Sequence, residues 1–90
     1  MGTAAVKIKL IPTSPEVDLE QIKQKAKSIV DGKGGKNCQL SEEPIAFGLN
    51  SIIVFFAWDE SQELDPLENE LRKIENIQSA EITDMRRAFG

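Results

Sequence analysis

The 90-residue sequence has no histidine, no tyrosine and a single cysteine. The absence of histidine excludes acid–base catalysis and metal ligation by imidazole. Cys38 alone cannot form an internal disulfide or a zinc site built from several thiolates. No apolar run approaches the roughly 18 residues that a membrane-spanning helix needs. Residues 1–6 lack the basic and apolar regions of a signal peptide, so we expect one cytoplasmic domain spanning residues 1–90, with no membrane partner.

The net charge of −4 is unevenly distributed along the chain. Residues 1–40 carry seven lysines against four acids, whereas residues 41–90 carry four basic residues against eleven acids. Affinity for phosphate backbones comes from basic residues that release counterions. The acidic total therefore argues against direct binding of nucleic acid, and a solvated surface is the simplest interpretation of the asymmetry.

Hydrophobic periodicity predicts a strand and then a helix in the first half of the chain. Residues 4–11 alternate between apolar and polar side chains, which is typical of a half-buried strand. Asp18 is a suitable N-cap for a helix over residues 19–30, and Gln21 stands where a capping box requires it. The apolar face of this helix repeats at spacings of three and four, through Leu19, Ile22, Ala26 and Ile29. The glycines of residues 31–36 predict a loop after it.

The second half predicts two strands, a helix and a last strand. Residues 38–45 contain Pro44, which cannot donate to a sheet ladder, so this strand is expected at an edge. Residues 49–58 carry the strongest strand signal, and a short turn around Ala46–Gly48 joins the two. Asp65 is expected to cap the second helix. That helix buries Leu67, Leu71 and Ile74, and residues 80–85 form the last strand.

The order βαββαβ predicts an α+β, ferredoxin-like sandwich, with a four-stranded antiparallel sheet and two helices on one face. The strand over residues 49–58 is apolar on both faces, so Ile53 and Phe55 are expected on the open face of the sheet. Two interpretations are open there. Lys7 and Lys9 of the first strand cover them with their methylene groups, or the two side chains form a contact patch for a partner or a second copy.

Catalytic chemistry has little support in the sequence. Glu42 and Glu43 are neighbours on a predicted strand, where successive side chains point to opposite faces and do not converge on a substrate. The glycines and lysines of residues 31–36 do not match a phosphate-binding loop. Cys38 has no histidine to activate it, so we interpret it as a small buried apolar group. The sequence favours a binding protein over an enzyme, and we expect neither a cofactor nor a metal ion.

Two features are unusual for a purely structural domain. Residues 44–48 place the aromatic Phe47 at a loop tip between chain-breaking residues. Either its ring folds back onto the core or it contacts a partner. Arg86 and Arg87 form a basic end in an acidic half, just after the last predicted strand, where their side chains can project. They are either solubilising charge or, together with the loop aromatic, a means of binding another protein.

Three segments resemble archaeal elongation factor 1-beta: GTAAVKIKLIPTSPEVDLEQI at residues 2–22, EEPIAFGLNSIIV at residues 42–54 and SAEITDMRR at residues 79–87. That family is the guanine nucleotide exchange factor for the GTPase that delivers aminoacyl-tRNA to the ribosome. The resemblance covers residues 6–87. It implies a ferredoxin-like fold, the elongation GTPase as partner, and a monomer when free.

The resemblance also implies roles for particular residues. Pro44, Ile45, Phe47 and Gly48 correspond to the family segment whose Phe contacts the GTPase. A basic residue near the family's C-terminus reaches toward the magnesium and phosphate site of the GTPase. The ungapped match places Arg87 there, with Arg86 beside it. Eukaryotic relatives have Lys at that place, and a guanidinium is planar and bulkier than an ammonium.

Two other functions compete with this interpretation. A ferredoxin-like sheet can stack RNA bases, but that requires aromatics on both central strands and a basic face. The strand over residues 4–11 has no aromatic, and the chain is acidic. A regulatory module that dimerises through Ile53 and Phe55 and binds a small ligand is the second alternative.

Overall fold

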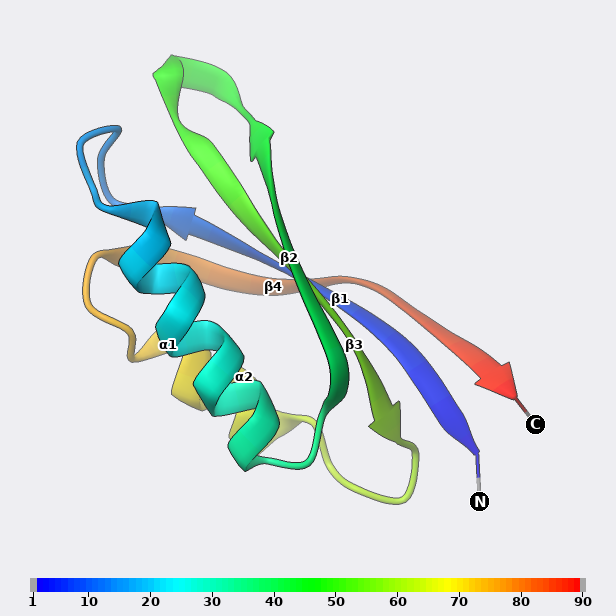
Figure 1. Cartoon of the computed structure of the whole chain (residues 1–90). Coiled ribbons are helices and arrows are strands. Elements are labelled where there is room, and N and C mark those ends of the chain that lie inside the picture. Colours follow the sequence, from blue (N-terminus) through cyan, green and yellow to red (C-terminus); the bar gives the residue numbers. More distant parts are fainter. Residues whose placement is uncertain (1, 90) are drawn as a thin grey trace.

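Two helices cover one face of a four-stranded antiparallel sheet in the computed structural model of the chain (Figure 1). The structure describes the backbone of residues 2–89 and the side chains of residues 2–86. This is the predicted ferredoxin-like arrangement. Its elements are β1 (Thr3–Pro12), α1 (Leu19–Gly32), β2 (Lys36–Pro44), the 3-10 turn η1 (Ala46–Gly48), β3 (Asn50–Asp59), α2 (Asp65–Arg72) and β4 (Ile77–Phe89).

Strand β1 lies inside the sheet and pairs with β3 on one side and β4 on the other, in the order β2-β3-β1-β4. Its side chains alternate between buried and half-buried along all ten residues, as the sequence predicts. Val6, Ile8 and Leu10 are fully buried under the helices. The core continues across β3 through Ile52 and Val54, because paired residues of neighbouring strands face the same side of a sheet.

The two helices begin differently. Asp18 caps α1 as predicted, and its carboxylate accepts hydrogen bonds from the backbone N–H groups of Glu20 and Gln21, at 3.1 and 3.4 Å. The prediction that Asp65 caps α2 is wrong, because Leu64 holds the cap position without a side-chain bond. The helix starts one residue earlier than expected, so Asp65 lies in its first turn, where a negative charge still complements the helix dipole. Within residues 2–89, neither helix has the length and apolar character needed to cross a membrane.

Strand β4 is much longer than the six residues that the sequence predicts. It runs over 13 residues and pairs with β1 from Pro12 opposite Ile77 to Thr3 opposite Phe89. The sequence conceals this length because one side of an edge strand faces water and tolerates polar residues. Strand β2 forms the other edge, as Pro44 predicts, and begins at Lys36, two residues before the expected start.

The face of the sheet away from the helices carries the two apolar side chains that the sequence places there. Ile53 is half-buried, and Phe55 is 39% exposed. The Nζ atom of Lys7, directly across from Phe55, lies 5.9 Å from the centre of its ring. The Lys7 ammonium thus lies over the ring of Phe55, and this contact leaves Phe55 partly exposed.

The turn between α1 and β2 depends on a glycine packed against the core. A Cβ atom added to Gly35 would overlap the Val30 side chain and lie 3.2 Å from a ring carbon of Phe56.

We expect Gly35→Ala to lower the free energy of unfolding by roughly 1–3 kcal/mol through overpacking. Chemical denaturation measures this change. Gly32→Ala is the matched control, because Gly32 ends α1 in open space, and alanine there should leave stability unchanged or raise it by up to about 1 kcal/mol. Equal stability of the two variants would contradict this packing argument.

Candidate functional site

The hairpin between β2 and β3 projects beyond the sheet at the top of Figure 1. Its tip comprises residues 44–49 and is closed by backbone hydrogen bonds. The Ile45 N–H donates to the Leu49 carbonyl at 2.8 Å, and the Leu49 N–H donates to the Ala46 carbonyl at 3.4 Å. Gly48 has a φ of 75°, a conformation that glycine adopts without strain. The tip thus has a defined shape that presents the residue between Ala46 and Gly48.

Phe47 is that residue, and its side chain is 94% exposed. The interpretation that its ring folds back onto the core is wrong. Its backbone also has a positive φ of 64°, which is uncommon for a residue with a bulky side chain. An exposed aromatic ring and a left-handed backbone are both unfavourable for an isolated domain. Such a combination points to a role in contact with a partner.

Polar contacts fix the stem of this hairpin. The buried Ser51 hydroxyl donates to the carbonyl of Glu43 at 3.0 Å and joins the two strands below the tip. Lys23 on α1 binds the Glu42 carboxylate at 2.6 Å, and this hydrogen bond is the main cause that raises the pKa of Lys23. Lys9 of β1 lies 3.9 Å from the Glu43 carboxylate. The hairpin is therefore connected to both the helix layer and the central strand.

The four residues that the sequence assigns to partner binding lie together at this tip. Pro44 ends β2, and its ring is exposed. Ile45 is half-buried and precedes the turn, while Phe47 and the exposed Gly48 lie within it. Together they form an apolar tip around the Phe47 ring.

The predicted basic residues lie inside β4 and not after the last strand, which corrects the expected position. Arg86 pairs with Ala5 of β1, and its side chain is 80% exposed. Its Nε atom lies 3.3 and 3.2 Å from the two carboxylate oxygens of Asp84. The backbone of Arg87 pairs with Ala4, and its side chain lies outside the described residues.

A β-bulge determines which residues accompany Arg86. Ile8 pairs with Ile82 and Lys7 pairs with Asp84, so Thr83 is the extra residue of β4. The bulge shifts the alternation by one residue, which puts Asp84 and Arg86 on the open face of the sheet. The sequence analysis did not identify Asp84 as the partner of Arg86. The spacing of two residues within one strand is the signal that could have shown it.

The aromatic tip and the basic strand end lie at opposite ends of the sheet. The tip directly precedes Asn50 of β3, whereas Arg86 shares a row with Ala5 and Ala57. At about 3.3 Å per residue, the rows of Asn50 and Ala57 are roughly 20 Å apart. Figure 1 shows the hairpin at the top and the end of β4 at the lower right. These two parts of the predicted site are therefore not brought together, and one small ligand cannot touch both.

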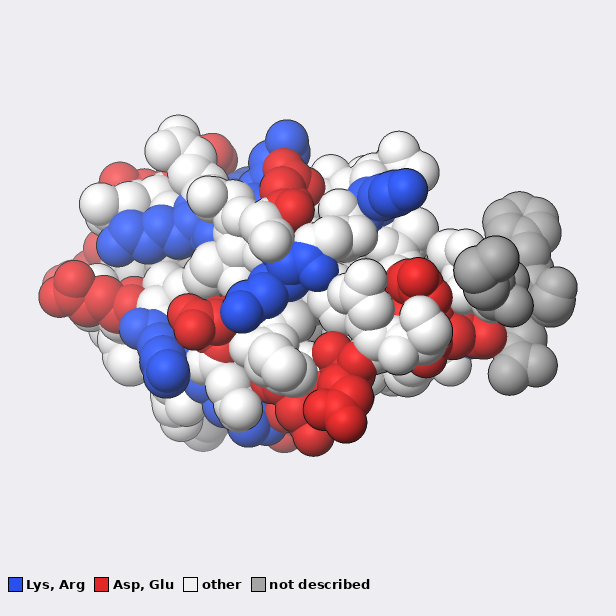
Figure 2. All heavy atoms as spheres, turned by 90° about the horizontal axis from the view of Figure 1, so that it is seen from below, with Lys and Arg blue, Asp and Glu red and all other residues white. Residues whose placement is uncertain are grey.

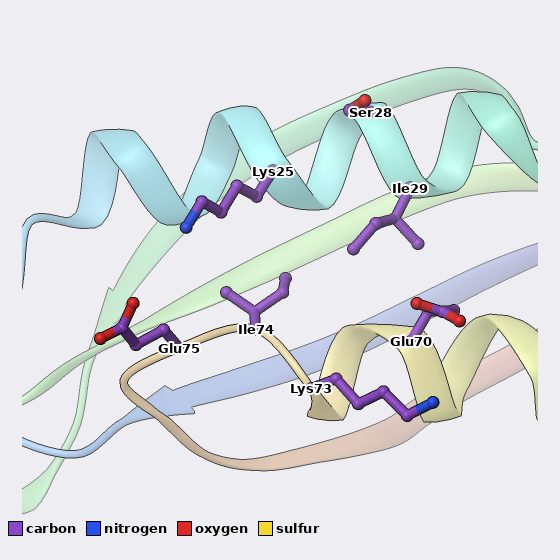
Figure 3. A pocket seen from close by; sticks show the side chains of 7 residues that line it. All are labelled: Lys25, Ser28, Ile29, Glu70, Lys73, Ile74 and Glu75. Atoms are coloured by element: carbon purple, nitrogen blue, oxygen red, sulfur yellow. The ribbon is translucent and has the colours of Figure 1, made fainter.

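One hollow lies between the two helices and has a volume of about 430 Å³. Figure 3 shows side chains of α1 facing those of α2 and of the turn after it. Ile29 and Ile74 lie between charged groups of both signs, so no single ligand charge is favoured. Its lining is Lys25, Ser28, Ile29, Glu70, Lys73, Ile74 and Glu75.

The arrangement of charged side chains bears on metal and nucleic-acid binding. Among the described residues, no group of three Cys, Asp or Glu side chains is arranged to hold a metal ion. In Figure 2, blue Lys and Arg and red Asp and Glu are interspersed over the face seen from below. A continuous basic surface, which nucleic-acid backbones require, is not visible on that face.

The fold, the exposed aromatic tip and the exposed cation are typical of a small α+β binding protein, with the tip and the cation at opposite ends of the sheet. Comparison with known proteins agrees with this class. The family model of the EF-1 guanine nucleotide exchange domain matches residues 5–88. The chain therefore belongs to the EF-1 guanine nucleotide exchange domain family, and it is an exchange factor of translation elongation.

Archaeal relatives are similar over nearly the whole chain. Elongation factor 1-beta of Methanococcus maripaludis strain C7 is 38% identical over 86 residues, which cover 94% of this chain and 97% of the relative. That of Methanosphaera stadtmanae is 38% identical over 88 residues, covering 97% and 98%. That of Methanosarcina acetivorans is 35% identical over 88 residues, covering 97% and 99%. The resemblance noted in the sequence is thus confirmed, and the alternative of a dimerising ligand-binding module is not favoured.

Cys38 lies half-buried against the core, as the sequence suggests, and burial is the main cause that raises the pKa of its thiol. The nearby charge of Asp31 acts in the same direction. The thiolate is the reactive form, so a raised pKa lowers reactivity at neutral pH.

We expect iodoacetamide to alkylate Cys38 in the folded protein more slowly at pH 7.5 than in the urea-unfolded protein, and the folded rate to rise with pH through and above the ordinary thiol range. Mass spectrometry of quenched samples measures both rates. A folded thiol that reacts faster than the unfolded one would show an activated nucleophile and contradict the structural role.

Proposed function

We propose that residues 1–90 act as a single cytoplasmic domain that promotes exchange of GDP for GTP on the elongation GTPase that carries aminoacyl-tRNA. The domain works as a monomer, makes no covalent bond and contacts neither nucleic acid nor membrane directly. The observation that carries the assignment of the site is Phe47, a residue that is 94% exposed at the hairpin tip and has a positive φ.

Exchange follows from the reciprocity of linked binding. A protein that binds the nucleotide-free GTPase more tightly than the GDP form must weaken GDP binding by the same factor. GDP then leaves faster, and GTP, which is abundant in the cell, rebinds and displaces the exchange factor. The factor therefore needs two properties, a stable contact with the GTPase and a group that opposes the bound nucleotide.

The hairpin tip supplies the stable contact in this proposal. Phe47 inserts its ring into an apolar recess of the GTPase, flanked by Pro44, Ile45 and Gly48. The turn is closed by backbone hydrogen bonds and the stem by the Ser51 hydroxyl, so little ordering entropy is lost on docking. Aromatic anchors of this kind commonly dominate the energy of a protein interface.

The basic end of β4 supplies the opposing group. The GTPase holds its nucleotide with a magnesium ion and a phosphate cradle. Arg87, helped by Arg86, competes electrostatically with the magnesium ion or draws away its ligands. In the free protein Asp84 occupies the Nε side of Arg86, and the two terminal amino groups of the guanidinium have no hydrogen bond among the described residues. A guanidinium with two free amino groups can bind phosphate or carboxylate in a bidentate manner.

Release of a fluorescent GDP analogue from an archaeal elongation GTPase, in excess GTP, tests the exchange function. We expect substoichiometric amounts of the protein to accelerate release many-fold. A rate that does not change, with a GTPase shown to bind nucleotide, would contradict the proposed function.

Removal of the anchor should weaken docking without changing the chemistry of release. We expect Phe47→Ala to raise the half-saturating concentration of the factor roughly tenfold or more, with a maximal exchange rate close to that of the wild type. Titration of the factor in the release assay gives both quantities.

Phe47→Asn separates loss of the ring from damage to the loop. Asparagine tolerates a left-handed backbone better than phenylalanine. We therefore expect this variant to be at least as stable as the wild type in thermal unfolding, yet to dock as weakly as the alanine variant. Full-strength docking by either variant would refute the anchoring role.

Removal of the Arg86 and Arg87 charges should slow nucleotide release more than it weakens docking. We expect Arg86→Ala and Arg87→Ala, singly and together, to lower the maximal exchange rate, the double variant by roughly 10- to 100-fold, with a smaller change in half-saturation. Lys73→Ala is the matched control, because it removes one exposed positive charge just after α2, near the Ala80 end of β4 and not the Arg86 end. If the double variant exchanged at the wild-type rate, the electrostatic part of the proposal would be wrong.

A further inference from the structure

Two exposed apolar side chains on β4 have no part in the contacts proposed so far. Ile82 is 37% exposed and Met85 is 52% exposed. They pair with Ile8 and Val6, both fully buried, so they lie on the side of the sheet that carries the core. Apolar side chains on that side of a sheet are normally covered.

The structure shows why these two are uncovered. Helix α2 has only eight residues and is about 12 Å long, whereas the 13 residues of β4 extend over roughly 43 Å. Ala80 is 2% exposed, and the exposed fraction rises to 37% at Ile82 and 52% at Met85. In Figure 1 the C-terminal part of β4 extends past both helices.

The bulge at Thr83 brings the two side chains onto one side. Residues three apart in a regular strand face opposite sides of the sheet. The extra residue changes this, so Ile82 and Met85 share the core side while Asp84 and Arg86 share the open side. Bulges are common next to functional sites because they redirect side chains. Between Ile82 and Arg86, β4 thus has apolar side chains on one side and charged side chains on the other, at an edge of the sheet.

We propose that Ile82 and Met85 form a second docking surface for the elongation GTPase, at the rim of its magnesium and phosphate site. The inference rests on the proposed function, because Arg86, the next residue along β4, opposes the nucleotide there. The surface joins an apolar strip to an exposed guanidinium, and this pattern complements an anionic site with an apolar border. Contact by Ile82 and Met85 excludes water from the rim and strengthens the electrostatic action of the cation.

This surface also provides docking at a distance from Phe47. The rows of Ile82 and Met85 lie roughly 13 and 20 Å from the row of Asn50, and two contacts at such a separation fix the orientation of the factor, which one aromatic anchor cannot do. The partner is the same at both ends, so the second contact forms at a high effective concentration once the first has formed.

Steady-state exchange with Ile82→Ser, Met85→Gln and the double variant tests this inference. We expect the double variant to raise the half-saturating concentration roughly tenfold, with the maximal rate kept within about twofold. The Arg86→Ala variant should show the reverse pattern, which separates docking from nucleotide release. Circular dichroism and thermal unfolding establish that each variant is folded, and Met85→Gln, at the more exposed position, serves if Ile82→Ser loses structure.

Phe55→Ser is the matched control, because Phe55 is 39% exposed on the opposite face of the sheet. It should leave the half-saturating concentration unchanged.

If the wild type accelerates exchange and the double variant has the same half-saturating concentration, this inference is overturned and the proposed function is left intact. An equal rise in the half-saturating concentration of the Phe55→Ser variant would also overturn this inference. Sedimentation that showed a wild-type dimer broken by the double variant, with exchange unchanged, would assign the surface to a second copy. If the wild type itself failed to accelerate exchange, that result would contradict the proposed function, on which this inference rests.

Discussion

The antiparallel pairing of β1 with both of its neighbours is the constraint on which the rest of the structure depends. Val6, Ile8 and Leu10 of this strand are fully buried, and a slip of one residue would turn them all to solvent. The same register sets the functional positions. It determines where β3 leaves the sheet to form the hairpin, and it sets Arg86 opposite Ala5. Core packing and site geometry are thus properties of one set of hydrogen bonds.

Around this strand the molecule keeps its unfavourable features at the periphery. A positive φ at Phe47, an exposed ring and an uncovered apolar pair on β4 each reduce the stability of a domain with a small core. Each lies where the polypeptide extends beyond the helix layer. Among the described residues, none of the core cluster has a positive φ, and the apolar side chains of the core pack against one another. The distribution is consistent with a rigid scaffold that presents contact groups at its ends.

Much of this could be predicted from the sequence, for identifiable reasons. Alternation in β1, the Asp18 cap and Pro44 at a sheet edge are local signals, and the structure confirms them. The length of β4 could not be predicted, because pairing with β1 and not composition keeps its polar residues in a strand. The bulge at Thr83 has no local signature either, so the faces of Asp84 and Met85 were not foreseeable. Phe47 was named from its loop, but its exposure depends on how far the hairpin overhangs the core.

The overhang of that hairpin has a geometric consequence. The two contact groups lie at opposite ends of one sheet, so the distance between them is fixed. In the proposed complex the factor can seat both ends only when the two receiving surfaces of the GTPase stand at the matching separation. Any rearrangement of the GTPase that changes this separation, including one driven by GTP, would unseat one end. Dissociation of the factor then follows from a mismatch of length, with no need for direct competition at either contact.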